Sequence, residues 1–398
     1  MATIPLQEPS YRGKDGPLFF AAGFRPFFLF AGIQAAVMLP LWLAVYTGAV
    51  SLNLPFAAAV WHGHEMVFGF AGAAVGGFLL TAVPSWTNTP HVSGKPLMAL
   101  FAIWLAGRIA FTLAGTLPPL LVAGLDLLYV PVLAVMLAKP LVRAGKWRNI
   151  AFIPILTLFL LANALVHFGA DPMRGVYLGI MLLLVMIAIV GGRIVPSFTQ
   201  NWLRMQGQPV ELKPLAWVEK GGAVGSVVLG GVLASIFPGS VAAGAVLLAA
   251  AAIHLLRLSR WFGLRTLSAP ILWVLHLGYL WLVIGLALLG IASFIDAFPI
   301  SAAVHALTAG CIGTMILGVM TRAALGHSGR PLVLSKAVVV AYVLVSLGTV
   351  LRVLAPLLPN AQMGLTHAGG TFWALAWLLF VIVYLPIVIR PRADGRAG

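Results

Sequence analysis

The sequence predicts an all-α fold, a polytopic membrane bundle of twelve transmembrane helices. The chain of 398 residues is 61% hydrophobic and only 8% charged, with a mean hydropathy of +1.05. A soluble domain is about 25% charged, so water is not the main solvent of this chain. Its apolar residues form segments of about 20, the length that crosses a bilayer. Its basic residues lie almost entirely in alternate gaps between these segments.

These segments define a single predicted transmembrane domain over residues 27–390. A 26-residue N-terminal tail, 1–26, and a short C-terminal tail, 391–398, flank it. The twelve spans are predicted at 27–47, 61–83, 97–116, 118–138, 149–169, 174–195, 216–236, 240–258, 270–292, 300–321, 334–355 and 368–390.

The distribution of Lys and Arg predicts the topology. All but Arg108, Arg174 and Arg352 fall in the two tails, in the even-numbered gaps or at the span ends that adjoin them. The positive-inside rule therefore places both termini in the cytoplasm and the odd-numbered gaps outside. The net charge of +15 follows from this topology, and no clustered basic face points to nucleic acid. Residues 1–26 lack the apolar core of a signal peptide, so we expect the first span to serve as the anchor.

Spans two, six and ten resemble one another, which predicts a four-span unit repeated three times, a pseudo-threefold 4+4+4 arrangement. Spans two and six share a Val-Pro-Ser-aromatic-Thr string, at 83–87 and 195–199, which we expect to end each helix. Spans two and ten share an early histidine, His64 and His305, followed by glycines. Chance similarity between glycine-rich membrane helices is the alternative.

Small residues follow each of these two histidines. They include Gly69 and Gly72 in span two, and Gly310 and Gly313 in span ten. Such faces allow helices to approach closely, or they leave room for a flat ligand. The sequence leaves both interpretations open.

Five of the nine histidines share the predicted outer level of the membrane. They are His62, His64, His167, His305 and His367. Neutral imidazole binds haem iron, copper and zinc, although a histidine at an interface often only hydrogen-bonds. Residues two apart on a helix point about 200° apart, so His62 and His64 are not expected to share one ion. The only cysteine, Cys311, excludes an internal disulfide and a cysteine-rich metal site.

Several charged residues accompany these histidines. Glu65 either orients an imidazole, passes protons or complements the helix dipole. Arg108 and Asp126 are each nine residues from Leu117 in the turn between spans three and four, which predicts a buried ion pair. Arg174 and Arg352 lie at the level of the histidines, where they either face haem propionates or snorkel to the surface.

Motifs spread over the chain resemble those of the NnrS family. They are Trp61-His62-Gly63-His64-Glu65-Met66, Gly191-Gly192-Arg193, Pro196-Ser197-Phe198-Thr199 and Gly326-His327-Ser328-Gly329-Arg330. The resemblance implies a haem- and copper-containing protein of the bacterial inner membrane, linked to nitric oxide metabolism and tolerance in denitrification or nitrosative stress. A looser resemblance to haem–copper oxidases implies a haem between spans two and ten. Span six has no histidine, so that fold's binuclear site is not expected.

We therefore expect His62, His64 and His305 to hold haem iron, with His167 and His367 as further metal ligands. In this hypothesis Arg174 and Arg352 bind propionates, and the four glycines accommodate the ring. The partners are the bilayer, nitric oxide or a related nitrogen oxide, and an electron donor. Whether the protein is a haem–copper oxidoreductase is left open. The alternatives are a transporter without a redox cofactor and a membrane chaperone for haem or copper.

Overall fold

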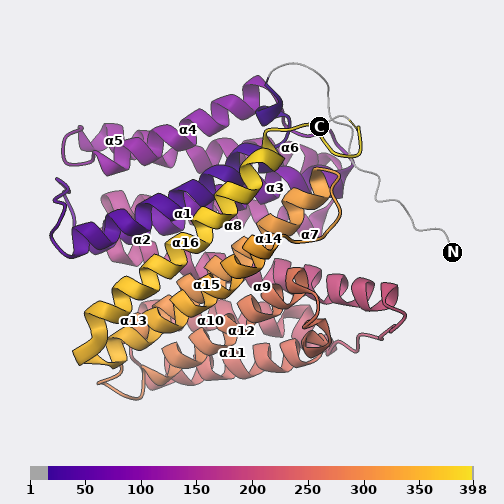
Figure 1. Ribbon diagram of the computed structural model, residues 1–398. Coiled ribbons are helices and arrows are strands. Elements are labelled where there is room, and N and C mark those ends of the chain that lie inside the picture. The colour runs from indigo at the N-terminus through magenta and orange to yellow at the C-terminus, as the bar shows by residue number, and fades with distance from the viewer. Residues whose placement is uncertain (1–16, 397–398) are drawn as a thin grey trace. The chain divides into compact units, whose positions relative to one another are not determined.

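The computed structural model describes residues 17–396 and contains only helices and their connections (Figure 1). The chain is 79% helical, and the described residues form no strand. The predicted all-α fold class is confirmed.

The helices follow one another with short connections. Their bounds are α1 (Phe24–Tyr46), α2 (Ala58–His64), η2 (Glu65–Ala71), α3 (Gly72–Thr87), α4 (Lys95–Thr112), α5 (Pro119–Leu127), α6 (Tyr129–Arg143), α7 (Trp147–Ile150), α8 (Phe152–Phe168), α9 (Pro172–Met205), η3 (Val218–Gly222), α10 (Ala223–Ile236), α11 (Val241–Ser259), α12 (Pro270–Ile291), α13 (Ile300–His305), η5 (Ala306–Ile312), α14 (Gly313–His327), α15 (Lys336–Leu354) and α16 (Gln362–Val388).

Eleven helices within residues 17–396 are long and apolar enough to cross a membrane, rather than the twelve predicted. Each of these helices overlaps one predicted span. Only the span predicted at 216–236 has no counterpart among them. There, α10 has only 14 residues and is preceded by the π-helical segment η3, inside which Gly221 leaves helical geometry. The kink divides the apolar run, so no single helix of spanning length forms. The chain is a polytopic membrane protein, and a twelfth span is not confirmed.

Most of the predicted N-terminal tail, residues 1–16 of 1–26, lies outside the described residues. Helix α1 begins at Phe24, and Arg25 in its first turn donates to the carbonyl oxygens of Val388 (2.6 Å) and Arg390 (2.9 Å). The last helix ends at Val388, close to the predicted boundary of the C-terminal tail.

The chain forms two compact units. The first comprises the described part of Met1–Gly179, with Arg322–Leu332 and the described part of Val381–Gly398. The second comprises Ile180–Thr321 and Val333–Phe380. Each unit is described by itself below, and both the single domain and the 4+4+4 arrangement stay predictions.

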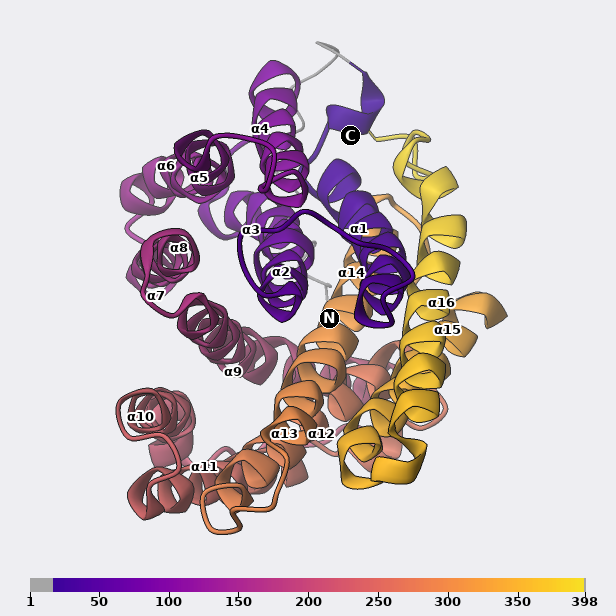
Figure 2. The same ribbon diagram turned by 90° about the vertical axis from the view of Figure 1, so that its left-hand side faces the viewer.

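In the first unit, the helix formed by α2, η2 and α3 lies among its neighbours. Segment η2 contacts α1 and α4, α3 contacts α1 and α6, and α2 contacts α8 (Figure 2). Large aromatic side chains fill the space between these helices, among them the fully buried Phe27 and Phe111 and the nearly fully buried Trp104. Its central position explains why polar side chains on α2 and η2 are shielded from lipid.

In the second unit, α12 packs against α11, α13 and η5. It is almost wholly apolar, and its buried face includes Leu275, Tyr279 and Leu282, each without exposed surface. Helix α11 also packs against α10, so α10, α11 and α12 form a continuous layer.

The resemblance between spans two and ten has a structural counterpart. In each, a short α-helix ends at the histidine, His64 or His305, and a seven-residue π-helical segment follows at once. Gly72 or Gly313 then begins the second α-helix. π-Helical segments are rare and are frequently found at functional sites. Span six shows no such segment, because α9 is one α-helix of 34 residues.

Each Val-Pro-Ser string was expected to end its helix, but only the first one does. Helix α3 ends shortly after Pro84, where Asn88 adopts the left-handed conformation. Helix α9 passes Pro196 and continues to Met205. A proline removes only one ladder hydrogen bond, and a membrane helix tolerates this when neighbouring groups compensate.

Candidate metal centre

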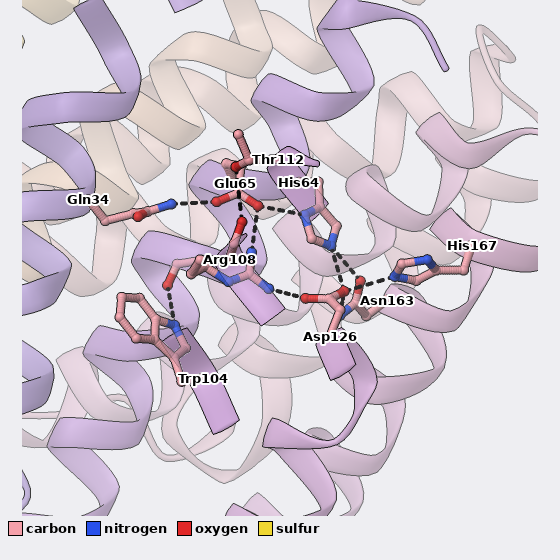
Figure 3. A network of polar contacts seen from close by, with 10 residues as sticks. Gln34, His64, Glu65, Trp104, Arg108, Thr112, Asp126, Asn163 and His167 are labelled. Carbon is pink, nitrogen blue, oxygen red and sulfur yellow. Dashed lines mark hydrogen bonds and ion pairs between the residues drawn. The ribbon is translucent and has the colours of Figure 1, made fainter. Parts of the chain in front are cut away.

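Seven polar side chains from five successive membrane helices meet in the first unit, and we call them the His64 cluster (Figure 3). They are Gln34 from α1, His64 and Glu65 from the α2–η2 junction, Arg108 from α4, Asp126 from α5, and Asn163 and His167 from α8. The change from α to π geometry after His64 alters the direction of the side chains that follow. His64 and Glu65 are adjacent in sequence but contact different neighbours: His64 contacts Asp126 and Asn163, and Glu65 contacts Gln34 and Arg108.

Two imidazoles and a carboxylate form the part of the cluster suited to a metal ion. Asp126 Oδ2 lies 2.9 Å from His64 Nε2 and 2.8 Å from His167 Nε2. One ligand atom from each of the three residues lies within 4.8 Å of the other two. Two atoms bound to one ion at about 2 Å lie roughly 3–4 Å apart, so small side-chain movements would bring all three onto one ion.

Asn163 completes this group. Its Oδ1 lies 2.9 Å from His64 Nε2, and its Nδ2 donates to Asp126 Oδ2 at 2.9 Å. A residue that contacts both ligands fixes their orientation, as outer-shell partners do in metal sites.

The charged side chains of the cluster are not balanced. Arg108 Nη1 donates to Glu65 Oε1 at 2.7 Å, and Nη2 donates to Asp126 Oδ1. Glu65 also accepts from Gln34 Nε2 at 2.5 Å. With His64 and His167 neutral, two ionised carboxylates and one guanidinium leave one net negative charge, and all three charged side chains are at least 94% buried. Because a buried charge is costly, this arrangement favours a further positive charge among these residues, either a bound cation or a proton on an imidazole.

Aromatic rings enclose the metal-binding side. Phe111 stacks on His64 with ring centroids 3.5 Å apart, and Phe68 lies 5.1 Å from the same ring. Phe159 packs on Phe68 at 4.8 Å. Such surroundings have a low effective dielectric constant, which strengthens every charge interaction inside the cluster.

Comparison with known families agrees with the motifs. The family model described as NnrS protein matches residues 18–392, nearly the whole chain. The chain belongs to the NnrS family. A search of curated proteins gave no match.

In this member of the NnrS family, the predicted Arg108–Asp126 ion pair is confirmed, because both residues contact each other while buried. The opposite orientation of His62 and His64 is also confirmed. His62 stacks on Trp42 of α1 with centroids 4.6 Å apart, whereas His64 faces α4, α5 and α8. Glu65 contacts His64 Nδ1 at 3.3 Å, as expected of a residue that orients an imidazole.

The other predicted ligands lie elsewhere. His305 belongs to the second unit, where its Nδ1 lies 2.7 Å from the carbonyl oxygen of Ser301. Arg352 Nη2 donates to Ser301 Oγ at 3.3 Å, so Arg352 and His305 share a neighbour. His367 is half-buried in α16 of the same unit. The convergence of His305 with His62 and His64 stays a prediction.

Arg174 lies in the first unit and is highly exposed, with 78% of its side chain accessible. It pairs with Asp171 at 3.4 Å across one helical turn. Its predicted role as a propionate ligand stays a prediction.

Three of the four glycines predicted to flank a ring, Gly69, Gly310 and Gly313, are in close contact with side chains. A Cβ at Gly69 would lie 3.0 Å from Gln34 Nε2 and 3.2 Å from Arg108 Cδ. At Gly72 the nearest atom would be 3.8 Å away, and the Tyr129 hydroxyl donates to its carbonyl at 3.3 Å. The absence of a side chain at Gly69 therefore admits Arg108 to the cluster.

In the second unit, indole rings lie beside the corresponding glycines. A Cβ would lie 2.7 Å from Trp281 at Gly310 and 2.9 Å from Trp373 at Gly313. Close packing is thus the observed environment of both positions, and their role beside a haem stays a prediction.

Sequence reasoning did not identify Gln34 or Asn163 as members of the site. Asn163 could have been found, because it precedes His167 by four residues and such residues share one helix face. Gln34 had a weaker signal, a single amide in an otherwise apolar span.

Proposed function

We propose that this chain is a haem- and copper-binding protein of the bacterial inner membrane that acts in nitric oxide metabolism or tolerance, with copper held by His64, Asp126 and His167. One observation carries the proposal: a buried group of two imidazoles and a carboxylate with one net negative charge. The link to nitric oxide rests on membership of the NnrS family.

The donor set fits copper by its chemistry. Imidazole nitrogen suits copper and zinc, and a carboxylate adds an anionic oxygen that favours a divalent ion. His64 Nε2, His167 Nε2 and Asp126 Oδ2 would hold the ion, and Asn163 and Arg108 would orient Asp126. When bound, copper would supply one-electron redox chemistry in an apolar site.

Support for haem comes from the second unit. A carbonyl oxygen only accepts, so the 2.7 Å contact with Ser301 places the proton of neutral His305 on Nδ1 and the lone pair on Nε2. That tautomer suits an axial haem ligand. His62, Arg174 and Arg352 stay predicted haem contacts, whereas this proposal assigns His64 to copper.

The predicted topology belongs to the same proposal. The positive-inside distribution supports cytoplasmic termini. Both termini can lie on the same side only if the number of spans is even, so this proposal requires the twelfth span. Accessibility of single cysteines introduced near the two ends of the chain, in intact cells and in permeabilised cells, would test the topology.

Copper analysis of the purified full-length protein tests the site. We expect one tightly held copper per chain, with nitrogen coupling from two imidazoles in the EPR spectrum of the oxidised form. His64→Ala and His167→Ala should each remove most of this copper, whereas His276→Gln, a buried control in α12, should retain it. Unchanged copper content and unchanged EPR coupling in both alanine variants would refute the assignment.

Haem requires a separate measurement. The purified protein from haem-sufficient cells should show a Soret band, which His305→Ala should shift or remove. A colourless preparation would contradict the haem proposal and leave the copper site to be judged by its own test. For the cellular role, the native protein should restore growth in the presence of a nitric oxide donor to cells that lack it. The double variant His64→Ala/His167→Ala should not.

A further inference from the structure

A second buried polar group lies in the second unit and plays no part in the proposed metal sites. Tyr279 of α12 and His254 of α11 have no exposed surface. The Tyr279 hydroxyl lies 2.7 Å from His254 Nδ1, and His254 Nε2 lies 3.0 Å from the carbonyl oxygen of Ala223.

These two contacts fix the direction of the hydrogen bonds. A carbonyl oxygen only accepts, so Nε2 of His254 carries a proton and donates to Ala223. In the neutral imidazole, Nδ1 then holds the lone pair and accepts the phenolic proton of Tyr279. The phenol is thus hydrogen-bonded to a base that can take its proton.

An ion pair, Arg257 and Glu219, lies beside Tyr279 and His254, and Arg257 only donates hydrogen bonds to the phenolic oxygen. Arg257 Nη1 donates to the Tyr279 oxygen at 2.9 Å and to the carbonyl oxygen of Ala188 at 2.7 Å. Its Nε and Nη2 donate to the two carboxylate oxygens of Glu219 at 2.9 Å and 2.5 Å. The Arg257 donor stabilises electron density on the phenolic oxygen, and Glu219 balances the guanidinium.

An aromatic neighbour connects Tyr279 to the end of the helix pair. The rings of Trp261 and Tyr279 have centroids 4.5 Å apart. Trp261 lies in the connection between α11 and α12, where Leu264 is 86% exposed. An electron can therefore reach Tyr279 through an aromatic contact near the surface of the unit.

We propose that Tyr279 is a redox-active tyrosine whose oxidation is coupled to proton transfer to His254. A strong one-electron oxidant, either an oxidising radical or a metal centre in a high oxidation state, accepts one electron from Tyr279. The phenolic O–H bond breaks, the proton forms a new N–H bond at His254 Nδ1, and a neutral tyrosyl radical remains. A one-electron reductant such as a thiolate or a quinol re-reduces the radical, the N–H bond at His254 Nδ1 breaks, and the proton returns to the phenolic oxygen.

The local transfer matters because the site is dry. Oxidation without proton loss would leave a cationic phenol radical, which is a strong acid, and neither Tyr279 nor His254 has exposed surface from which solvent could accept its proton. Moving the proton along an existing 2.7 Å hydrogen bond avoids that species. By comparison, the hydroxyl of the buried Tyr129 donates to the backbone carbonyl of Gly72, which is not a base that can take up a proton.

The test is photo-oxidation of the full chain in detergent by flash-generated ruthenium(III) tris-bipyridine, with the radical detected by EPR and optical absorbance. We expect a neutral tyrosyl radical in the native protein and its loss in Tyr279→Phe. Tyr342→Phe, which removes another buried phenol, should leave the signal unchanged.

His254→Gln separates proton acceptance from hydrogen bonding, because glutamine keeps a polar side chain but cannot take up the proton. We expect the yield or lifetime of the radical to fall by roughly an order of magnitude or more. In deuterated buffer, native protein should be oxidised more slowly, a readout that needs no variant. A radical that persists in Tyr279→Phe, or identical behaviour of His254→Gln and the native protein without an isotope effect, would overturn the proposal.

Discussion

The charge count of the His64 cluster predicts an unequal response to three substitutions. Removing Arg108 by Arg108→Leu leaves Glu65 and Asp126 buried without their shared cation. Removing either carboxylate charge, by Glu65→Gln or Asp126→Asn, leaves one carboxylate paired with Arg108 and no excess charge. We therefore expect Arg108→Leu to be the most destabilising of the three.

The structure gives the expected magnitudes. Both partners of Arg108 are within 1% of complete burial, so loss of the guanidinium should cost about 3–5 kcal/mol, the range for breaking a buried pair. The amide variants retain shape and some hydrogen bonds, so each should cost about 1–3 kcal/mol. As a matched control, Arg174→Leu removes an arginine from the exposed pair with Asp171 and should cost less than about 1 kcal/mol.

Unfolding in mixed micelles of dodecyl maltoside and increasing dodecyl sulfate, in the presence of a chelator, measures these free energies without a contribution from bound metal. The reasoning would be refuted if Asp126→Asn destabilised the protein as much as Arg108→Leu does. That outcome would mean that Asp126 is required by its hydrogen bonds with His64, His167 and Asn163 rather than by the charge balance.

Two further predictions concern stability. Burial, together with the nearby Arg392 guanidinium, lowers the pKa of His91, in the α3–α4 connection, from 6.5 to about 4. Because the pKa of His91 is lower in the folded than in the unfolded state, the free energy of unfolding should be highest above about pH 6.5. It should fall by up to about 3 kcal/mol as the pH approaches 4. His91→Gln should flatten this pH dependence. A Cβ at Gly76 would overlap the Tyr129 hydroxyl, so Gly76→Ala should cost about 1–3 kcal/mol in the same unfolding assay. Gly124→Ala meets nothing within 4 Å in α5 and should instead stabilise by up to about 1 kcal/mol; equal effects of the two glycine variants would count against the packing described here.

The sequence predicted most of the helices because an apolar segment of spanning length can satisfy its backbone in lipid only as a helix. It also predicted the Arg108–Asp126 pair, because equal distances from the turn place two residues at equal depth. It did not predict the break before α10, which lies in η3 where Gly221 leaves helical geometry. Nor did it predict the continuation of α9 past Pro196, because a proline removes only one ladder hydrogen bond and does not by itself decide whether a helix ends.

The candidate site was predicted in part for a related physical reason. Sequence spacing gave the depth of His64, His167 and Asp126 but not the rotation of each helix about its axis. The π-helical segment after His64 alters that rotation, and ideal α-helical geometry cannot anticipate it. The ligand group therefore combines residues that the sequence had assigned to separate roles, a haem ligand, a further ligand and an ion pair.

The two α–π–α helices show how similar segments can provide different sites. After His64 the first π-helical residue is Glu65, whose carboxylate contacts Arg108 and His64; after His305 it is the buried Ala306, which offers no charge. The first histidine is consequently surrounded by carboxylates, whereas the second is oriented by the backbone carbonyl of Ser301. An anionic surrounding favours a bare metal cation, and a neutral imidazole with its lone pair on Nε2 favours the iron of a prosthetic group. Under the proposed function, this exchange of glutamate for alanine would distinguish the copper site from the haem site, so Glu65→Ala should lower copper content while leaving the Soret band unchanged.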